Sequence, residues 1–229
     1  MGYETRFRHE NKYEISYGQY LCIRARLRAV CRPDPHARDD GTYLIRSIYF
    51  DNRDDKALIE KVSGAARREK FRIRYYNDDL SYVTLEKKQK INGLCKKAEC
   101  SLTKDEMCDI LSGDTEFMRS HSSPLVRELY TDMKTQQLRP RVIVSYQREP
   151  YIYGPGNVRV TFDSKIKTAP IGKDLPDRVR DISATDDPGM MIMEVKYDDF
   201  LPDIIKTIVN EGNILQQSFS KYEACRRYG

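Results

Sequence analysis

The sequence contains no tryptophan and only three histidines, His9, His36 and His121, which lie far apart along the chain. Its six cysteines include no C-x-x-C pair, and only Cys95 and Cys100 stand close together. Structural zinc sites usually combine closely spaced cysteines with nearby histidines or further cysteines. The sequence therefore argues against a structural zinc site, and we expect reduced cysteines that are mostly buried as small hydrophobic side chains.

Long apolar runs are also missing. A membrane-spanning helix needs about 18 or more apolar residues in succession, and no stretch of the sequence approaches that length. Residues 1–12 lack the apolar core of a signal peptide, so we expect a soluble, cytoplasmic protein. At 229 residues with 39% hydrophobic composition the chain can bury a substantial core, and without repeats or an evident linker we expect one domain over residues 1–229.

Positive charge exceeds negative charge only slightly. The 40 lysines and arginines face 35 aspartates and glutamates, which leaves a net charge of +5. Any affinity for anions must therefore come from the arrangement of the cations and not from bulk charge. The 16 tyrosines fit strands better than a base-stacking surface, so no nucleic acid partner is expected.

Strand-like runs outnumber helical patterns, which predicts an α+β fold. Alternating patterns predict strands at residues 6–15, 43–51, 69–76, 81–91, 94–101, 141–149, 158–163 and 191–197. Helical spacing and end signals, including a capping box from Thr103 to Glu106, predict helices at residues 18–30, 103–113, 123–138, 202–212 and 218–228. Turn residues at "YNDDLS" and "YGPGN" favour antiparallel neighbours, and residues 31–41 and 173–190 read as loops.

Residues 70–90 show an unusual alternation of charge. Lys70, Arg72 and Arg74 share one side of a strand, and residues 84–90 repeat the pattern with Thr84, Glu86, Lys88 and Lys90. Like charges at adjacent positions on one face repel each other. The face is therefore either exposed to water, as in an ordinary antiparallel sheet, or it is a polar interior that an anion neutralises.

The other predicted strands also pair a polar face with an apolar one, which favours the second interpretation. If eight such strands close into an antiparallel β-barrel with helices packed around the outside, the charged faces form a tunnel. Its predicted lining cations are Lys12, Arg72, Arg74, Lys88, Lys90, Arg148, Arg159 and Lys196. Such a tunnel calls for a polyanion such as a phosphate chain. Glu10, Glu86 and Glu194 would then be oxygen ligands for Mg²⁺ or Mn²⁺, although a glutamate taken singly is more often a salt-bridge partner.

Eight motifs in order support a specific resemblance. They are "RHENKYEI", "RSIYFDN", "KFRIRYY", "LEKKQKINGLCKK", "RPRVIVSYQREPY", "VRVTFDSKI", "IMEVKY" and "SFSKY", which span residues 8–222. Together they resemble the triphosphate tunnel metalloenzymes, and within that superfamily the polyphosphate polymerase domain of the vacuolar transporter chaperone (VTC) type. Ala98 and Lys165 depart from the pattern, which puts details of the tunnel rim in doubt.

The resemblance implies transfer of the ATP γ-phosphoryl group to a growing inorganic polyphosphate chain, with Mn²⁺ or Mg²⁺ as cofactor. At matching positions it implies that Lys12, Arg72, Arg74, Lys88, Arg148, Arg159, Lys196 and Lys221 contact phosphate, with Ser220 beside them. Glu194 is the best match to a metal ligand, and Lys70 and Lys90 are expected at the tunnel rim. No P-loop signature is present, so nucleotide would be held by side chains.

Two alternatives remain open at this point. One is a metal-dependent tripolyphosphatase or nucleoside triphosphatase on the same fold, in which water replaces the acceptor. The other is a non-catalytic module that binds polyanions and does not turn over ATP. The sequence is silent on the acceptor, the oligomeric state and any membrane partner that might receive the polymer.

Overall fold

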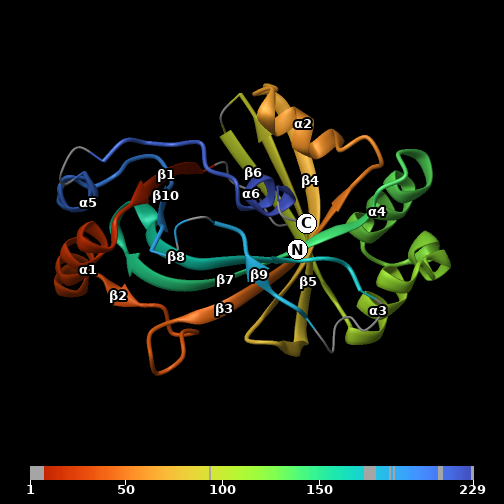
Figure 1. Cartoon of the computed structure of the whole chain (residues 1–229), viewed down its shortest axis with the longest axis horizontal. Helices are drawn as coiled ribbons and strands as arrows, with labels where there is room; N and C mark the ends of the chain where they lie inside the picture. The colour runs from red at the N-terminus through yellow and green to blue at the C-terminus, as the bar shows by residue number, and fades with distance from the viewer. Residues whose placement is uncertain are drawn as a thin grey trace.

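The computed structural model describes residues 8–92, 94–172, 179–185, 187, 189–210 and 214–227. One antiparallel sheet dominates this part of the chain (Figure 1). Its strands are β1 (His9–Ile15), β2 (Arg32–Pro33), β3 (Tyr43–Asp51), β4 (Arg67–Tyr76), β5 (Asp79–Ile91), β6 (Leu94–Leu102), β7 (Arg139–Tyr153), β8 (Val158–Ala169), β9 (Ile182–Ser183) and β10 (Met191–Tyr197). The eight longer strands match the predicted runs, whereas β2 and β9 escaped prediction because each has only two residues.

The order of the eight longer strands is β1-β10-β8-β7-β3-β4-β5-β6, and the short strands β2 and β9 pair with β7 and β8. The two edge strands, β1 and β6, approach each other at one isolated bridge between Arg8 and Cys95. No ladder of hydrogen bonds joins these edges within the described residues. The large antiparallel sheet of the prediction is confirmed, but the hydrogen-bonded closure into a barrel is not.

Six α-helices accompany the sheet in the described residues: α1 (Tyr17–Val30), α2 (Lys56–Val62), α3 (Lys104–Ser112), α4 (Pro124–Thr135), α5 (Asp203–Val209) and α6 (Lys221–Arg226). Two short 3₁₀ helices, η1 (Glu116–Ser120) and η2 (Pro155–Asn157), complete the set. The capping box that joins Thr103 and Glu106 is confirmed at the start of α3. Sequence reasoning missed α2, and the predicted stop of α5 at Gly212 lies outside the described residues. None of the helices in the described ranges combines the length and apolar character needed to cross a bilayer.

Alternation along the strands places two apolar clusters on the outer, convex face of the curved sheet. On β4, Phe71, Ile73 and Tyr75 are buried in the cluster beneath α3, η1 and α4. At the other end, side chains of β1, β8 and β10 pack against α1 and α5. Figure 1 shows these helix pairs at opposite ends of the sheet. The prediction that helices cover apolar outer faces holds for these two regions.

The inner, concave face is not entirely charged, which corrects the predicted picture of a continuous charged tunnel. Part of it carries a third apolar cluster, in which Tyr49 and Val142 from neighbouring strands meet Tyr222 and Cys225 of α6. Helix α6 therefore packs on the inside of the sheet and not around its outside. Tyr222 is anchored there because its hydroxyl donates to the buried carboxylate of Asp51. The concave face is thus divided between a charged region and an apolar region that α6 covers.

The packing of α4 on the outer face predicts a large cost for truncating its central leucine. Leu129 is completely buried in the cluster with β4 and β5, so Leu129→Ala should lower the free energy of unfolding by about 2–5 kcal/mol. Leu215, which is 78% exposed, provides the control, because Leu215→Ala should change it by no more than about 0.5 kcal/mol. Urea unfolding of the two variants measures the difference, and equal losses would contradict the placement of α4.

Candidate anion-binding site

Two adjoining cavities occupy the charged region of the concave face. The inner cavity, of about 60 Å³, is lined by Glu10, Lys12, Tyr49, Lys70, Arg72, Arg74, Lys88, Tyr146, Arg148, Glu194, Lys196, Ser220, Lys221 and Tyr222. The outer cavity, of about 330 Å³, shares five of these residues and adds Lys61, Arg68, Lys90 and the segment 216–219 among others. Eight cationic side chains and only two carboxylates line the inner cavity. Such a surplus of cations suits a ligand with several negative charges.

The cavity is assembled from residues that alternate along the strands. On β4, Arg72 and Arg74 alternate with side chains that face the outer side of the sheet. On β10, Glu194 and Lys196 alternate with outer-facing side chains in the same way. The strands β1, β5 and β7 supply further side chains by the same rule of period two. Helix α6 completes the wall, because its N-cap residue Ser220 is followed at once by Lys221 and Tyr222.

A network of lysines surrounds the two carboxylates that line the inner cavity. Lys88 Nζ lies 2.8 Å and 2.6 Å from the two carboxylate oxygens of Glu10, and Lys12 Nζ lies 3.3 Å from one of them. Lys196 Nζ is 2.8 Å from Glu194 and 3.9 Å from Glu10, so it bridges the pair. Burial and the nearby charge of Glu194 would raise the pKa of Glu10, but the three lysines outweigh both and hold it far below its usual range.

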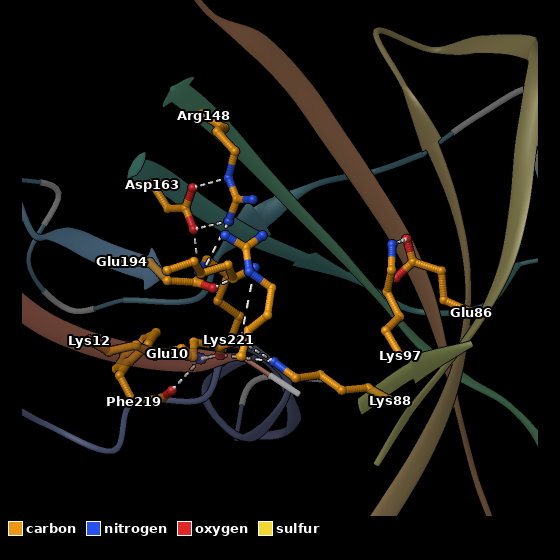
Figure 2. Close-up of polar contacts among 12 residues, drawn as sticks. Glu10, Lys12, Glu86, Lys88, Lys97, Arg148, Asp163, Glu194, Phe219 and Lys221 are labelled. Carbon is orange, nitrogen blue, oxygen red and sulfur yellow. Dashed lines mark hydrogen bonds and ion pairs between the residues drawn. The ribbon is translucent and has the colours of Figure 1, made fainter. Parts of the chain in front are cut away.

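A second network holds Arg148 in the wall. Its guanidinium donates two hydrogen bonds, of 2.6 Å and 2.7 Å, to the fully buried carboxylate of Asp163 on β8. Lys221 Nζ reaches the same carboxylate at 2.5 Å, and Arg148 also lies 3.5 Å from Glu194. Burial would raise the pKa of Asp163, yet Arg148 and Lys221 keep it below its usual value. This carboxylate ties α6 to the strands and orients both cations toward the cavity (Figure 2).

Glu86 plays a comparable part beneath Arg72 and Arg74. Arg72 Nε donates to Glu86 at 2.7 Å, and Arg74 Nη1 lies 3.5 Å from its other oxygen. Glu86 is 1% exposed and does not line either cavity. Figure 2 shows it with Lys97, apart from the cluster around Glu10 and Glu194. Its carboxylate therefore holds two guanidinium groups in place from behind.

The structure brings together most of the side chains that the sequence nominated. Those that line the inner cavity are Lys12, Arg72, Arg74, Lys88, Arg148, Lys196, Ser220, Lys221, Glu10 and Glu194. Lys90 lines the outer cavity. Arg159 lines neither of them, and its guanidinium instead donates to Asp34 and to the hydroxyl of Tyr43.

Sequence reasoning missed several lining residues. Tyr49, Tyr146 and Tyr222 belong to the inner cavity, and Lys70 lines both cavities where they join, although it was expected at the rim. The alternation that placed Arg72 and Arg74 inside applied equally to Lys70. Tyr49 lies in "RSIYFDN" on β3 and pairs with Arg72 of β4, so the two side chains share one face of the sheet. The alternation within that motif was the signal that could have indicated Tyr49.

The carboxylates fit a divalent cation only in part. No group of three or more His, Cys, Asp or Glu side chains that could hold a metal lies together within the described ranges. Glu10 and Glu194, however, are both ionised and lie near enough to repel each other. Mg²⁺ typically binds one or two carboxylates and completes its shell with water and substrate phosphates. The donor set of this cavity is compatible with that mode, in which Glu10 and Glu194 would be the protein ligands.

The fold is thus a curved antiparallel sheet whose concave face carries a cavity with a surplus of cations. The family model described as the VTC domain matches residues 7–228, and the chain belongs to this family. This match confirms the resemblance that the sequence motifs indicate. No curated protein matches the chain.

Solved structures share the fold at low sequence identity. A suggested adenylate cyclase from Bacillus halodurans is 16% identical, with a TM-score of 0.52 over 90% of this chain and 88% of that chain. The PH1819 protein from Pyrococcus horikoshii OT3 is 15% identical, with a TM-score of 0.51 over 97% and 99% of the two chains. At these identities the likeness concerns the fold alone.

The buried pair of Arg148 and Asp163 predicts a strong stability effect. Arg148→Ala leaves the fully buried carboxylate with Lys221 alone, so it should lower the free energy of unfolding by about 3–5 kcal/mol. Adding Asp163→Asn to that variant should recover part of the loss, because the uncompensated charge is removed. Chemical denaturation of both variants checks this, and the absence of any recovery would show that the charge is not the cause.

Glu86 predicts a specific dependence of stability on pH. Burial would raise its pKa, but Arg72, Arg74 and Lys97 together hold the pKa well below its usual value of 4.5. A depressed folded-state pKa adds stability that is present above pH 4.5 and is lost as the pH falls. The advantage of the wild type over Glu86→Gln should therefore shrink by about 1 kcal/mol between pH 5 and pH 3.5. Denaturation curves at both values test this, and a constant difference would contradict it.

Proposed function

We propose that this protein is a metal-dependent polyphosphate polymerase, which transfers the γ-phosphoryl group of ATP to the end of an inorganic polyphosphate chain. The observation that carries the proposal is the pair of adjoining cavities with a surplus of cations. A single phosphate group would need far fewer cations than the eight that line the inner cavity. The outer cavity continues this surface with Lys61, Arg68 and Lys90, which suits a chain that extends beyond the site of transfer.

The proposed reaction balances simply. An oxygen of the terminal phosphate of the chain attacks the γ-phosphorus of ATP, the bond from that phosphorus to the β,γ-bridging oxygen breaks, and ADP leaves with the electron pair. The attacking oxygen is already anionic, so the step needs no strong general base. Phosphoryl transfer depends chiefly on positioning and on stabilisation of charge by fixed cations. Arg72, Arg74 and Arg148 are suited to this, because buried carboxylates fix their guanidinium groups.

The remaining cavity cations would bind the flanking phosphates. Lys12 is held by Glu10 and donates to the backbone oxygen of Phe219 at 3.2 Å, which fixes the direction of its side chain. Lys88 and Lys196 lie on the two sides of Glu10. When bound, Mg²⁺ or Mn²⁺ at Glu194 and Glu10 would neutralise charge on the phosphate oxygens. Both carboxylates would then exchange lysine contacts for metal contacts, which would leave those lysines available to phosphate.

A product assay tests the proposal. Purified protein incubated with ATP and Mn²⁺ should yield ADP and a ladder of polyphosphate on a stained gel. Orthophosphate without a ladder would indicate a tripolyphosphatase or nucleoside triphosphatase instead. Binding of polyphosphate without any consumption of ATP would indicate a non-catalytic module, and either result would overturn the polymerase proposal.

Lys196 offers the sharpest substitution for that assay. Its ammonium group lies between the two cavity carboxylates and is 31% exposed, so Lys196→Ala should fold while turnover falls by about 100-fold or more. Lys134 is the matched control, because it pairs with Glu116 on the surface of α4, and Lys134→Ala should change turnover less than about twofold. Initial rates of ADP release measure both, and similar losses in the two variants would exclude a role for the cavity.

A further inference from the structure

Lys70 differs from the other cations of the inner cavity. Seven of the eight have a carboxylate partner within 4 Å, as Lys12, Arg72, Arg74, Lys88, Arg148, Lys196 and Lys221 each do. Lys70 forms no ion pair with any residue in the described part of the chain. It is also the cation of β4 that lines both cavities, so it stands where a bound chain would pass from one to the other.

Aromatic rings take the place of a carboxylate beside Lys70. Its Nζ lies 5.3 Å from the ring centroid of Tyr49 and 5.7 Å from that of Tyr222, within the range of cation–π contacts. Tyr49 is 5% exposed, and its hydroxyl oxygen accepts a hydrogen bond of 2.8 Å from Arg72 Nη1. The Tyr49 oxygen therefore lies among cations without a carboxylate of its own, and it can act as their counter-anion when it loses its proton.

The pKa values of Tyr49 and Lys70 both lie near physiological pH. Burial alone would raise the pKa of Tyr49, but Arg72, Lys70 and Arg74 outweigh it and lower the pKa to about 7. Burial lowers the pKa of Lys70 to about 8, with help from Lys88, Lys12 and Arg72, while Tyr49 acts in the opposite direction. The charged or titratable groups on the surrounding elements are Glu10, Lys12, Lys61, Arg68, Glu69, Arg72, Arg74, Glu86, Lys88, Lys90, Cys95, Tyr146, Arg148, Glu194, Lys196, Lys221 and Tyr222.

We propose that Lys70 and Tyr49 form a proton-coupled phosphate subsite at the junction of the two cavities. An incoming phosphate group displaces the tyrosinate oxygen from Arg72 Nη1, while Glu86 keeps its contacts with the same guanidinium, and binds Lys70 in its ammonium form. Both changes favour the protonated side chains, so the protein takes up protons from solvent as the chain binds. The subsite rests on the proposed function only in taking a phosphate chain as its ligand, and it does not require that the chain be extended.

The number of protons taken up on binding follows from the pKa values of Tyr49 and Lys70. At about pH 7.5 Tyr49 is mostly ionised and Lys70 mostly protonated, so full protonation of both on binding takes up about one proton. At about pH 8.5 Lys70 contributes most of a further proton, whereas at about pH 6 both groups are already protonated and uptake is close to zero. Tyr49 therefore supplies most of the uptake near neutral pH, and Lys70 adds to it above pH 8.

Calorimetry with tripolyphosphate measures this uptake directly. Binding enthalpies at one pH in buffers of different ionisation enthalpy give the number of protons exchanged. Against the wild type, Tyr49→Phe should reduce the proton uptake at pH 7.5, and Lys70→Arg should reduce it at pH 8.5. Tyr130→Phe is the matched control, because Tyr130 lies on α4, lines neither cavity and donates to Glu116, and this variant should retain the uptake. The ionisation of tripolyphosphate itself is common to all variants and cancels in these differences.

A measurement without substitutions guards against variants that fail to fold. The near-ultraviolet absorbance of tyrosinate in the wild type should rise around pH 7 by the amount expected for one residue, and added tripolyphosphate should abolish that rise. Tripolyphosphate binding with the same proton uptake in all variants, or with an unchanged tyrosinate signal, would overturn the subsite while leaving the polymerase proposal intact. Proton-coupled binding by a protein that makes no polymer would support the subsite and overturn the polymerase. Failure of the wild type to bind tripolyphosphate would overturn both.

Discussion

The rest of the structure depends on one electrostatic constraint, which is that many like charges share one face of a sheet. Two cations at i and i+2 on a strand repel each other, and the repulsion grows when the face is shielded from water. The chain meets this constraint with carboxylates set behind the cavity wall. Glu86 and Asp163, which are 1% and 0% exposed, each hold cationic side chains that then extend toward the cavity. The cations remain fixed in the folded protein, and the cavity keeps a positive surplus for a ligand.

That arrangement requires rigid support on the opposite face of the same strands. On β4, large apolar side chains alternate with Arg72 and Arg74. These apolar side chains are almost completely buried under α3 and α4. A backbone shift that relieved the repulsion inside would therefore open the apolar core outside. Helix α6 adds a second restraint from the inner side, because Tyr222 and Lys221 are both bound to buried aspartates. Preorganised cations of this kind are what electrostatic stabilisation of a phosphoryl transfer requires.

Much of this could be predicted from the sequence, because period-two alternation is a local property. Alternation identified the eight longer strands and eight of the ten nominated residues that line the inner cavity, whereas Ser220 and Lys221 were indicated by the family resemblance. Closure of the sheet could not be derived in the same way, since it depends on how the edges β1 and β6 approach each other over a long separation in sequence. The apolar part of the concave face was also hidden, because the residues of α6 that cover it are not adjacent in sequence to any strand they contact. The placements of Glu86 and Arg159 depended on which partner each side chain meets, and alternation alone carries no such information.

The pairing of cations with carboxylates in the two cavities affects whether a bound phosphate chain would be extended or hydrolysed. In the inner cavity seven of the eight cations have a carboxylate partner within 4 Å, which fixes the direction of their side chains. In the outer cavity Lys70 and Lys90 form no ion pair within the described residues. A polyanion should therefore be attracted within the site of transfer and also just outside it. A chain retained there would keep its end near the γ-phosphate and would compete with water for that position, which is the physical condition that favours a polymerase over a phosphohydrolase.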